Sequence, residues 1–295
     1  DEKKLATLEQ IIRRSSQYPG RLKALADNSH SLLRDYYANK GRFDDYTVGI
    51  PEVTEIASLV TEEGEIIPEA VAVYLSLEAE GLKLANQVVW AEPAGGRGER
   101  LSKDQPIAYK GIKPALLIAL ISENSQFARF QTRQIMGWQR LTSQLNHQDR
   151  PLINAIMSSE DNDEDLHRLY SEHNYFGADP DLVNIYPQPL VFAVDTYEGH
   201  FAVEDDNPYR LAEKAHGHGD IHMVFYQQDV AKAAMEQEAR YIVFYQDTNL
   251  PIFRAILPAL ALTECKKLAL SFIASPRYPG SNVGALAKLT HKQTG

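Results

Sequence analysis

The chain has 295 residues, of which 44% are apolar and 24% charged, and its formal net charge is −10. This composition is ordinary for a globular protein, and the length allows one large domain or two smaller ones. The acidic balance argues against a general nucleic-acid binder, which needs a basic face. The single cysteine, Cys265, excludes an internal disulfide and fits a reducing compartment. No apolar run approaches the length of a membrane span and no signal-peptide pattern stands at the N-terminus, so we expect a cytoplasmic protein.

Helices are predicted at the start of the chain. Apolar residues recur at helical spacing in residues 3–17 and again in residues 21–37, with Pro19-Gly20 between the two. Residues 40–76 are irregular and contain two prolines and an acidic patch. We therefore expect residues 1–74 to form a helical N-terminal region that serves packing or positioning.

From residue 75 onward the pattern alternates between helix and strand. Helices are predicted over residues 75–87, 115–121 and 126–145, and strands over residues 88–90, 152–157, 182–185, 190–194, 241–245 and 267–274. Strands separated by helical segments indicate βαβ units. The prediction for residues 75–295 is an α/β domain with a mixed, mostly parallel sheet and helices on both faces, where ligands bind beyond the carboxyl ends of the strands.

A glycine-rich stretch follows the first predicted strand. Residues 94–113 read AGGRGERLSKDQPIAYKGIK, in which Gly95, Gly96 and Gly98 stand in front of Arg100, and Lys113 follows. Glycine allows a sharp turn and close approach to peptide N–H groups, while arginine supplies a planar cation. This pattern predicts a cradle for phosphate groups. An ordinary surface loop stays open as the alternative.

Two familiar phosphate motifs are absent from the stretch. A P-loop needs Gly-Lys-Ser/Thr after four spacer residues, and the chain has no such triplet there. The dinucleotide fingerprint GxGxxG would begin at Gly96, but its sixth position is Leu101. The cradle is therefore neither a P-loop nor a dinucleotide fingerprint.

Polar residues also follow two other predicted strands. Ser158-Ser159 come after one strand, and Gln246-Asp247-Thr248-Asn249 after another. A carboxylate at this edge suits Mg²⁺, which prefers one or two carboxylates together with substrate phosphate oxygens. An Asx turn or a helix N-cap before Pro251 is the alternative role for Asp247.

Two further clusters of charged and histidine residues can be interpreted as structural or as functional. Residues 216–222, HGHGDIH, carry three histidines and an aspartate and could bind zinc, but the interleaved glycines favour a turn that a ligand approaches closely. Residues 160–165, EDNDED, precede a helical pattern and so favour the first turn of a helix, where acidic residues complement the helix dipole. Metal binding is the alternative for both.

Several of these motifs, taken in order, resemble the UDP-sugar pyrophosphorylase family of uridylyltransferases. They are AGGRGERL, YKGIK, PYRLAEKAHGHGDIH, FYQDTN, and SPR with LAKLTH, with NYFG and MSSED at the expected places between them. The resemblance covers nearly the whole chain. It implies a Rossmann-like nucleotidyltransferase fold, with UTP and a sugar 1-phosphate as substrates and Mg²⁺ as cofactor.

The resemblance also implies a role for individual residues. Gly95, Gly96 and Gly98 match the phosphate-binding glycine loop, and Arg100 and Lys113 match the basic residues that neutralise the triphosphate. The positions that read uracil correspond to Met157, Gln188, Gly217 and the adjoining His218. Asp247 matches the Mg²⁺ ligand, with Asn249 beside it. A glutamine amide can pair with a uracil edge as donor and acceptor at once.

The chain departs from the family pattern at several places, three of which bear on the function. Arg97 stands where the family has an apolar residue, residues 102–108 look like an insertion, and the resembling proteins continue well beyond residue 295. The sequence therefore leaves three functions open. The first is the nucleotide-binding half of a working uridylyltransferase, the second is a diverged nucleotide-binding or regulatory protein without turnover, and the third is a zinc-dependent hydrolase that uses His216, His218 and His222.

Overall fold

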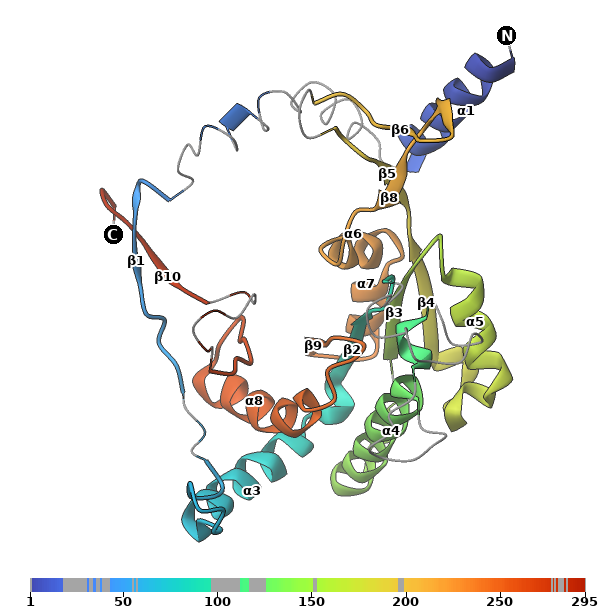
Figure 1. The fold of residues 1–295 in the computed structure, drawn as a ribbon. Helices are drawn as coiled ribbons and strands as arrows, with labels where there is room; N and C mark the ends of the chain where they lie inside the picture. Colours follow the sequence, from blue (N-terminus) through green and yellow to red (C-terminus); the bar gives the residue numbers. More distant parts are fainter. Residues whose placement is uncertain are drawn as a thin grey trace. The chain divides into compact units, whose positions relative to one another are not determined.

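The computed structural model describes residues 2–17, 31, 34–35, 38, 43–54, 56, 58–96, 112–116, 126–150, 153–195, 199–276, 278, 280, 284 and 286–294. The chain forms two compact units, coloured by sequence in Figure 1. Unit 1 consists of Asp1–His30 and Leu82–Phe253, and unit 2 consists of Ser31–Gly81 and Arg254–Gly295. Each unit combines segments from both sides of residue 74, and the predicted domain boundary there stays a prediction.

Unit 1 is built on a four-stranded sheet in the order β4-β3-β2-β9. Its strands are β2 (Val88–Pro93), β3 (Ile153–Ser159), β4 (Val183–Gln188) and β9 (Tyr241–Phe244), and all neighbouring pairs run parallel. Every residue of β3 is buried, as expected for a central strand of a parallel sheet that is covered on both faces. All the carboxyl ends of these strands therefore meet at one edge of the sheet.

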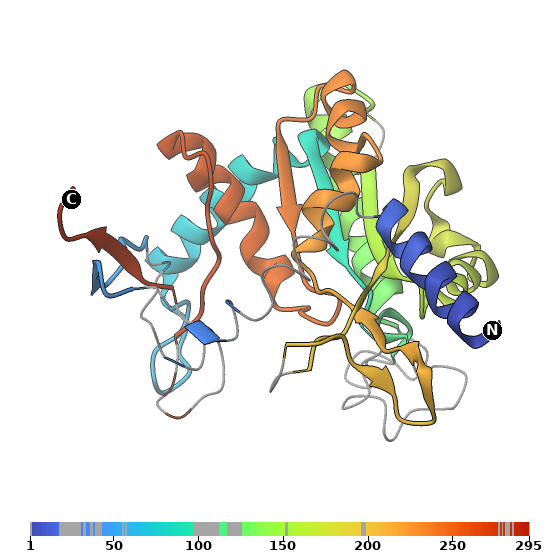
Figure 2. The same ribbon diagram turned by 90° about the horizontal axis from the view of Figure 1, so that it is seen from above.

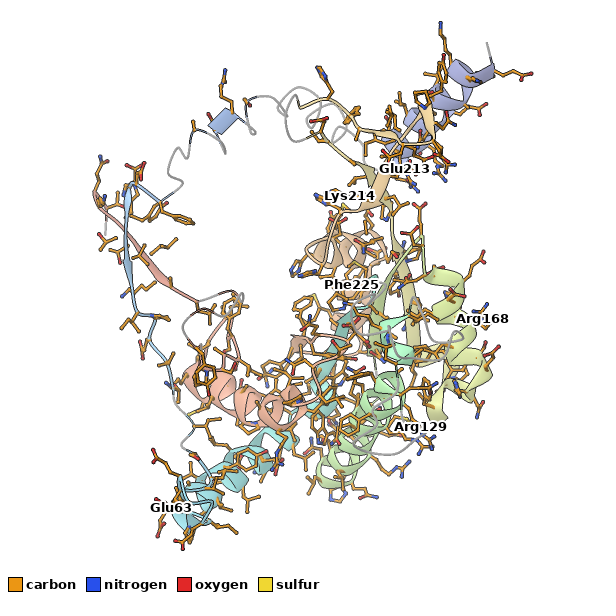
Figure 3. All side chains as sticks on the ribbon, in the orientation of Figure 1. Glu63, Arg129, Arg168, Glu213, Lys214 and Phe225 are labelled. Carbon is orange, nitrogen blue, oxygen red and sulfur yellow. The ribbon has the colours of Figure 1, made fainter. Side chains whose placement is uncertain are left out.

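Helices cover both faces of this sheet, as Figure 2 shows from above. On one face α4 (Phe127–Asn146) and α5 (Asp163–Glu172) share a core with β3 and β4. On the other face α6 (Asp220–Gln227) and α7 (Val230–Glu236) pack on β2 and β3, with Phe225 of α6 (labelled in Figure 3) in that second core. The α/β class with helices on both faces, predicted from the alternating pattern, is confirmed.

Smaller elements complete unit 1 around the sheet. Strand β5 (Leu190–Phe192) pairs antiparallel with β8 (Glu213–Ala215), and β6 (Val203–Glu204) pairs antiparallel with β7 (Asn207–Leu211). Helix α1 (Glu2–Gln17) contacts β7. The short 3-10 helices are η1 (Ala85–Gln87), η3 (Lys113–Ala115), η4 (Asn174–Gly177) and η5 (Pro180–Leu182).

Unit 2 contains most of α3 (Pro68–Leu82) and α8 (Ile252–Lys266), together with the antiparallel pair β1 (Tyr46–Gly49) and β10 (Lys288–His291). The two helices approach closely at Gly81, because a Cβ atom added there would lie 1.9 Å from the carbonyl oxygen of Leu257. Only glycine leaves room for this backbone contact. None of the helices in the described part of the chain is long and apolar enough to cross a membrane.

The predicted helices over residues 3–17 and 126–145 are confirmed, whereas the helix predicted over residues 75–87 is α3, which begins earlier, at Pro68, and ends at Leu82. Proline suits a first helical turn, where its missing N–H needs no partner. The predicted helix over residues 21–37 and the one over residues 115–121 fall largely outside the described residues.

The strand predicted over residues 267–274 is wrong. This segment is irregular, and Leu270 and Phe272 are exposed. Its alternating apolar residues have the period of a strand, but no described strand pairs with it, and a strand without a partner leaves its backbone groups unsatisfied. Ser158 and Ser159, expected just beyond a strand, are the last two residues of β3.

Candidate functional site

The glycine stretch leaves the sheet at the carboxyl end of β2, where a backbone hydrogen bond and one side chain hold its first residue. The Ala94 N–H donates to the Met157 carbonyl oxygen at 2.7 Å. Asn162, before α5, donates from Nδ2 to the Ala94 carbonyl oxygen at 2.9 Å and accepts from the Ser159 N–H at 2.8 Å. The turn therefore starts from a position tied to the end of β3.

Gly95, Gln188 and Gly217 meet at this edge although they come from three separate segments. A Cβ atom at Gly95 would lie 2.4 Å from Gln188 Nε2 and 3.0 Å from the Ser158 carbonyl oxygen, so a side chain there would displace the Gln188 amide. Gln188 is the last residue of β4 and is buried, and its Oε1 accepts from the Gly217 N–H at 3.4 Å. Gly217 has a φ of +130°, which side chains rarely allow. The structure thus joins three of the residues predicted to bind nucleotide.

Lys113 and Asp247 form the charged centre of the site. Lys113 begins η3, Asp247 follows β9, and Lys113 Nζ lies 3.6 Å from Asp247 Oδ2. A Cβ atom at Gly96 would lie 2.9 Å from Lys113 Nζ, so the lysine lies against the glycine turn. The Gln131 side chain of α4 holds the Asp247 carbonyl oxygen through Nε2 at 2.9 Å. The predicted basic residue and the predicted metal ligand are therefore neighbours.

The Asp247 carboxylate is fully buried, and neither of its oxygens has a hydrogen-bond partner within the described residues. Burial raises the pKa of this carboxyl group, and the Lys113 ammonium group opposes the shift by favouring the ionised form. Lys113 balances the charge of the carboxylate from ion-pair distance, but a buried carboxylate whose oxygens accept no hydrogen bond is still costly. Its environment therefore suits a bound cation.

A second buried acid, Glu92, was missed by the sequence analysis. Glu92 lies on β2, and its Oε2 accepts a hydrogen bond from the Tyr245 hydroxyl at 3.1 Å, while Oε1 has no partner within the described residues. Burial first, and the charge of Asp247 second, raise the pKa of Glu92 to about 8. The available signal was a glutamate within an otherwise apolar strand directly before the glycine turn, since buried acids are rare.

Of the histidine–glycine segment, residues 216–219 form a loop between β8 and α6, and residues 220–222 begin α6. His216 Nδ1 lies 2.7 Å from Asp220 Oδ1, and His222 packs edge-on against Phe244. A pocket of about 610 Å³ lies beside the loop, lined by His216, Gly217, Gly219, Asp220, His222, Met223 and Tyr226. Within the described ranges no three acidic, cysteine or histidine residues gather to hold a metal ion.

The remaining predicted residues differ in how they are placed. Met157 is buried, and its side chain belongs to the core beneath α6 and α7. His218 is exposed in the histidine–glycine loop, and Asn249 closes a turn after β9 by donating from its N–H to the Gln246 carbonyl oxygen at 3.1 Å. Gly98 and Arg100, like Arg97 and residues 102–108, lie outside the described residues.

The acidic run of residues 160–165 does begin a helix. Asp163, Glu164 and Asp165 stand in the first turn of α5, as the dipole argument predicted. Glu160 precedes the helix and makes an ion pair with Arg14 of α1.

The fold is that of pyrophosphorylase nucleotidyltransferases. The uridine diphosphate N-acetylglucosamine pyrophosphorylase of Trypanosoma brucei, solved with an inhibitor, matches with a TM-score of 0.64 at 17% identity, covering 82% of this chain and 46% of that one. A UDP-glucose pyrophosphorylase mutant of Leishmania major, solved with UDP-glucose, matches with a TM-score of 0.51 at 18% identity, covering 90% of this chain and 48% of that one. At sequence identities this low, the structural similarity establishes the fold alone.

In sequence, the chain is similar to UDP-sugar pyrophosphorylases over nearly its whole length. It is 29% identical to the UDP-sugar pyrophosphorylase of Oryza sativa subsp. indica over 293 residues, and 29% identical to that of Arabidopsis thaliana over 295 residues. Each alignment covers 99% of this chain and 45% of the relative, so the chain spans about half the length of the curated relatives it matches. No protein-family model matches. The resemblance drawn from the motifs is confirmed.

Proposed function

We propose that the protein is a uridylyltransferase that makes a UDP-sugar and pyrophosphate from UTP and a sugar 1-phosphate, with this chain forming the nucleotide-binding half. One observation carries the proposal. A lysine and a fully buried carboxylate without hydrogen bonds lie together against a glycine turn, at the carboxyl edge of a parallel sheet. Ligands of such sheets bind at this edge. The names of the similar proteins support the choice of UTP and a sugar phosphate.

The triphosphate would bind along the glycine turn. The peptide N–H groups of Gly95, Gly96 and Gly98 would donate to phosphate oxygens, and Lys113 and Arg100 would neutralise their charge. Lys113 Nζ already lies against Gly96, which supports a shared phosphate. The roles of Gly98 and Arg100 rest on the resemblance.

The uracil base would bind where Gln188 and Gly217 meet. The Gln188 amide carries both an acceptor and a donor, which matches the alternating groups of the uracil edge. Gly217 allows a flat base to approach the backbone closely. Met157 and His218 are assigned to the base pocket by the resemblance alone, since the Met157 side chain lies in the core. The contact between Gln188 Oε1 and the Gly217 N–H supports a single base pocket made by both residues.

Asp247 would hold Mg²⁺, and its buried oxygens without hydrogen bonds fit that role. Mg²⁺ supplies neutralisation of the charge on the phosphate oxygens when it is bound. Asn249, two residues later, would lie beside this ligand. Gln131, through its bond to the Asp247 backbone, keeps the carboxylate in position.

In the reaction, a phosphate oxygen of the sugar 1-phosphate would attack the α-phosphorus of UTP in line with the departing pyrophosphate. The protein forms no covalent bond in this mechanism, so positioning and charge neutralisation provide the rate enhancement. Lys113 would stabilise the negative charge that develops on the departing pyrophosphate.

A reducing compartment, expected from the single cysteine, stays a prediction.

The test is the release of pyrophosphate from UTP and glucose 1-phosphate in the presence of Mg²⁺. We expect release in wild type, and a loss of Mg²⁺-dependent release in Asp247→Ala. Binding of UTP without any release would instead support the diverged, inactive protein. Failure to bind UTP at all would overturn the proposal.

A further inference from the structure

Helix α1 makes an extensive polar contact with two segments that end near the proposed base pocket. We name this contact the arginine clasp and define it as Arg14 of α1 with Glu160 and Glu213. The Arg14 side chain is 0% exposed, whereas those of Glu160 and Glu213 are 27% and 10% exposed. A fully buried arginine is unusual, because arginine is seldom buried unless it is paired.

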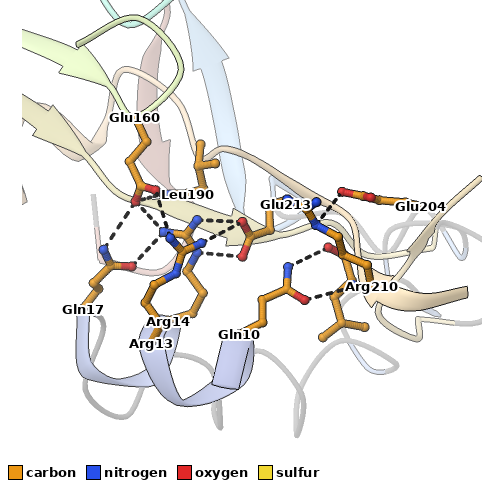
Figure 4. Close-up of polar contacts among 10 residues, drawn as sticks. Gln10, Arg13, Arg14, Gln17, Glu160, Leu190, Glu204, Arg210 and Glu213 are labelled. Carbon is orange, nitrogen blue, oxygen red and sulfur yellow. Dashed lines mark hydrogen bonds and ion pairs between the residues drawn. The ribbon is translucent and has the colours of Figure 1, made fainter. Parts of the chain in front are cut away.

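Arg14 uses both edges of its guanidinium group, as Figure 4 shows. Its Nε donates to Glu213 Oε1 at 2.8 Å and its Nη2 donates to Glu213 Oε2 at 2.7 Å, which makes a two-bond fork. Its Nη1 donates to Glu160 Oε1 and, at 2.8 Å, to Gln17 Oε1. Forked arginine–carboxylate pairs add geometric specificity as well as energy. The guanidinium therefore sets the separation between the two acids.

Glu213 lies in the segment that carries Gly217, whereas Glu160, between β3 and α5, reaches the segment that carries Gln188 through one hydrogen bond. Glu160 Oε1 also accepts from the Leu190 N–H at 3.3 Å, which ties it to the residue two positions after Gln188. Glu213 begins β8, four positions before Gly217. Strands β5 and β8 pair with Leu190 opposite Ala215. The clasp thus joins the two segments whose ends meet in the Gln188–Gly217 contact.

A second side chain of α1 strengthens this attachment. Gln10 donates from Nε2 to the Leu211 carbonyl oxygen at 2.9 Å, and its Oε1 accepts from the Leu211 N–H at 3.1 Å. Leu211 lies two residues before Glu213. The helix therefore holds this strand segment by its backbone as well as by its acid.

The positive charge of Arg14 keeps both acids of the arginine clasp ionised. Burial favours the neutral form of Glu160 and of Glu213, but the hydrogen bond and charge of Arg14 outweigh it, so the pKa of each acid is lowered. Removing one member of such a buried arrangement leaves the others unpaired, which is strongly destabilising.

We propose that Arg14 is a positioning residue for the base end of the nucleotide, because the arginine clasp holds together the two segments that carry Gln188 and Gly217. The inference rests on the proposed function. It assigns the N-terminal helix a role in selecting the nucleotide base. Among the described residues, no hydrogen bond or ion pair joins the arginine clasp to the phosphate cradle at Gly95, Gly96 and Lys113.

The test compares the binding of UTP with that of inorganic tripolyphosphate, which carries the phosphates without a base. In Arg14→Ala we expect the Kd for UTP to rise at least tenfold and the Kd for tripolyphosphate to stay within twofold of wild type. Arg13→Ala is the matched control, because Arg13 reaches the same two acids but is 55% exposed. We expect it to leave both constants within twofold. Arg14→Lys, which keeps the charge but loses the fork, should give an intermediate rise.

Each outcome decides the matter. Equal losses of UTP and tripolyphosphate binding in Arg14→Ala would show a general structural role and overturn the inference, as would unchanged UTP binding. If Arg14→Ala fails to fold, Glu213→Gln replaces it in the same comparison, because the amide still accepts one bond from Arg14. If wild type binds tripolyphosphate but shows no preference for UTP, the proposed function itself fails. If wild type prefers UTP and the variants do too, only the inference fails.

Discussion

Lys113 contacts both the buried Asp247 carboxylate and the glycine turn of the proposed phosphate cradle. Its ammonium group lies 3.6 Å from a buried carboxylate and packs against Gly96. Lys113→Ala should lower kcat by about 10²–10³, the usual loss when one preorganised charge is removed from a transition state. The assay is pyrophosphate release at saturating UTP. Lys232→Ala, at an exposed position of α7, is the control, and an unchanged kcat in Lys113→Ala would remove the lysine from the mechanism.

Glu92 makes the stability of unit 1 depend on pH. Its pKa is raised to about 8 from 4.5, so between these values the folded protein keeps a proton that the unfolded chain has released. Stability therefore falls as the pH rises through this window, by at most ~1.4 kcal/mol per pH unit. Glu92→Gln carries no titrating group and should lose this slope, being more stable than wild type at pH 8.

The measurement for Glu92 is urea unfolding followed by tryptophan fluorescence at pH 5 and pH 8. The chain has two tryptophans, and both Trp90 and Trp138 lie in unit 1 with ring centroids 5.4 Å apart. Glu236→Gln, at an exposed position, is the control. Parallel pH profiles for wild type and Glu92→Gln would contradict the assigned shift.

Among the elements, α1 should respond to acid. The pKa values of Glu160 and Glu213 are lowered in the folded state, so their contribution to stability is complete above about pH 4.5 and is lost as the pH falls through the folded values. Glu213→Gln removes one of these groups. The stability difference between wild type and this variant should therefore shrink on going from pH 6 to pH 4, as measured by urea unfolding, and a constant difference would contradict the assignment.

The described residues of the proposed nucleotide site lie in one of the two compact units, and unit 2 can be altered separately. All described site residues belong to unit 1, whereas Gly81 and Leu257 make their close contact in unit 2. Gly81→Ala places a methyl group against the Leu257 backbone and should cost about 1–3 kcal/mol. We expect circular dichroism to show a lower melting temperature, while tryptophan fluorescence and UTP affinity stay unchanged.

Gly137→Ala is the matched control for Gly81→Ala. Gly137 also lies within a helix, but a Cβ atom there meets nothing within 4 Å. Alanine favours helix over glycine, so this variant should be neutral or more stable. A loss of UTP affinity in Gly81→Ala would show that unit 2 contributes to the site.

The sequence by itself determined the sheet and the candidate residues. Period and apolar content are local properties, and they located β2, β3, β4, β9 and α4 within a few residues. Glycines in front of an arginine, a lysine further on, and an acid after a strand pointed to phosphate and metal chemistry at a shared edge. The same local reasoning failed over residues 267–274, because a strand also needs a partner that its own residues do not specify.

Only the tertiary structure decided which distant residues act together. It placed Lys113 beside Asp247, Gln188 between Gly95 and Gly217, and Arg14 between Glu160 and Glu213, pairs separated by up to about two hundred residues. It also revealed Glu92, whose raised pKa depends on burial and on the charge of Asp247, which follows another strand. Contacts and burial of this kind arise when the chain closes on itself, so no local pattern of residue types contains them.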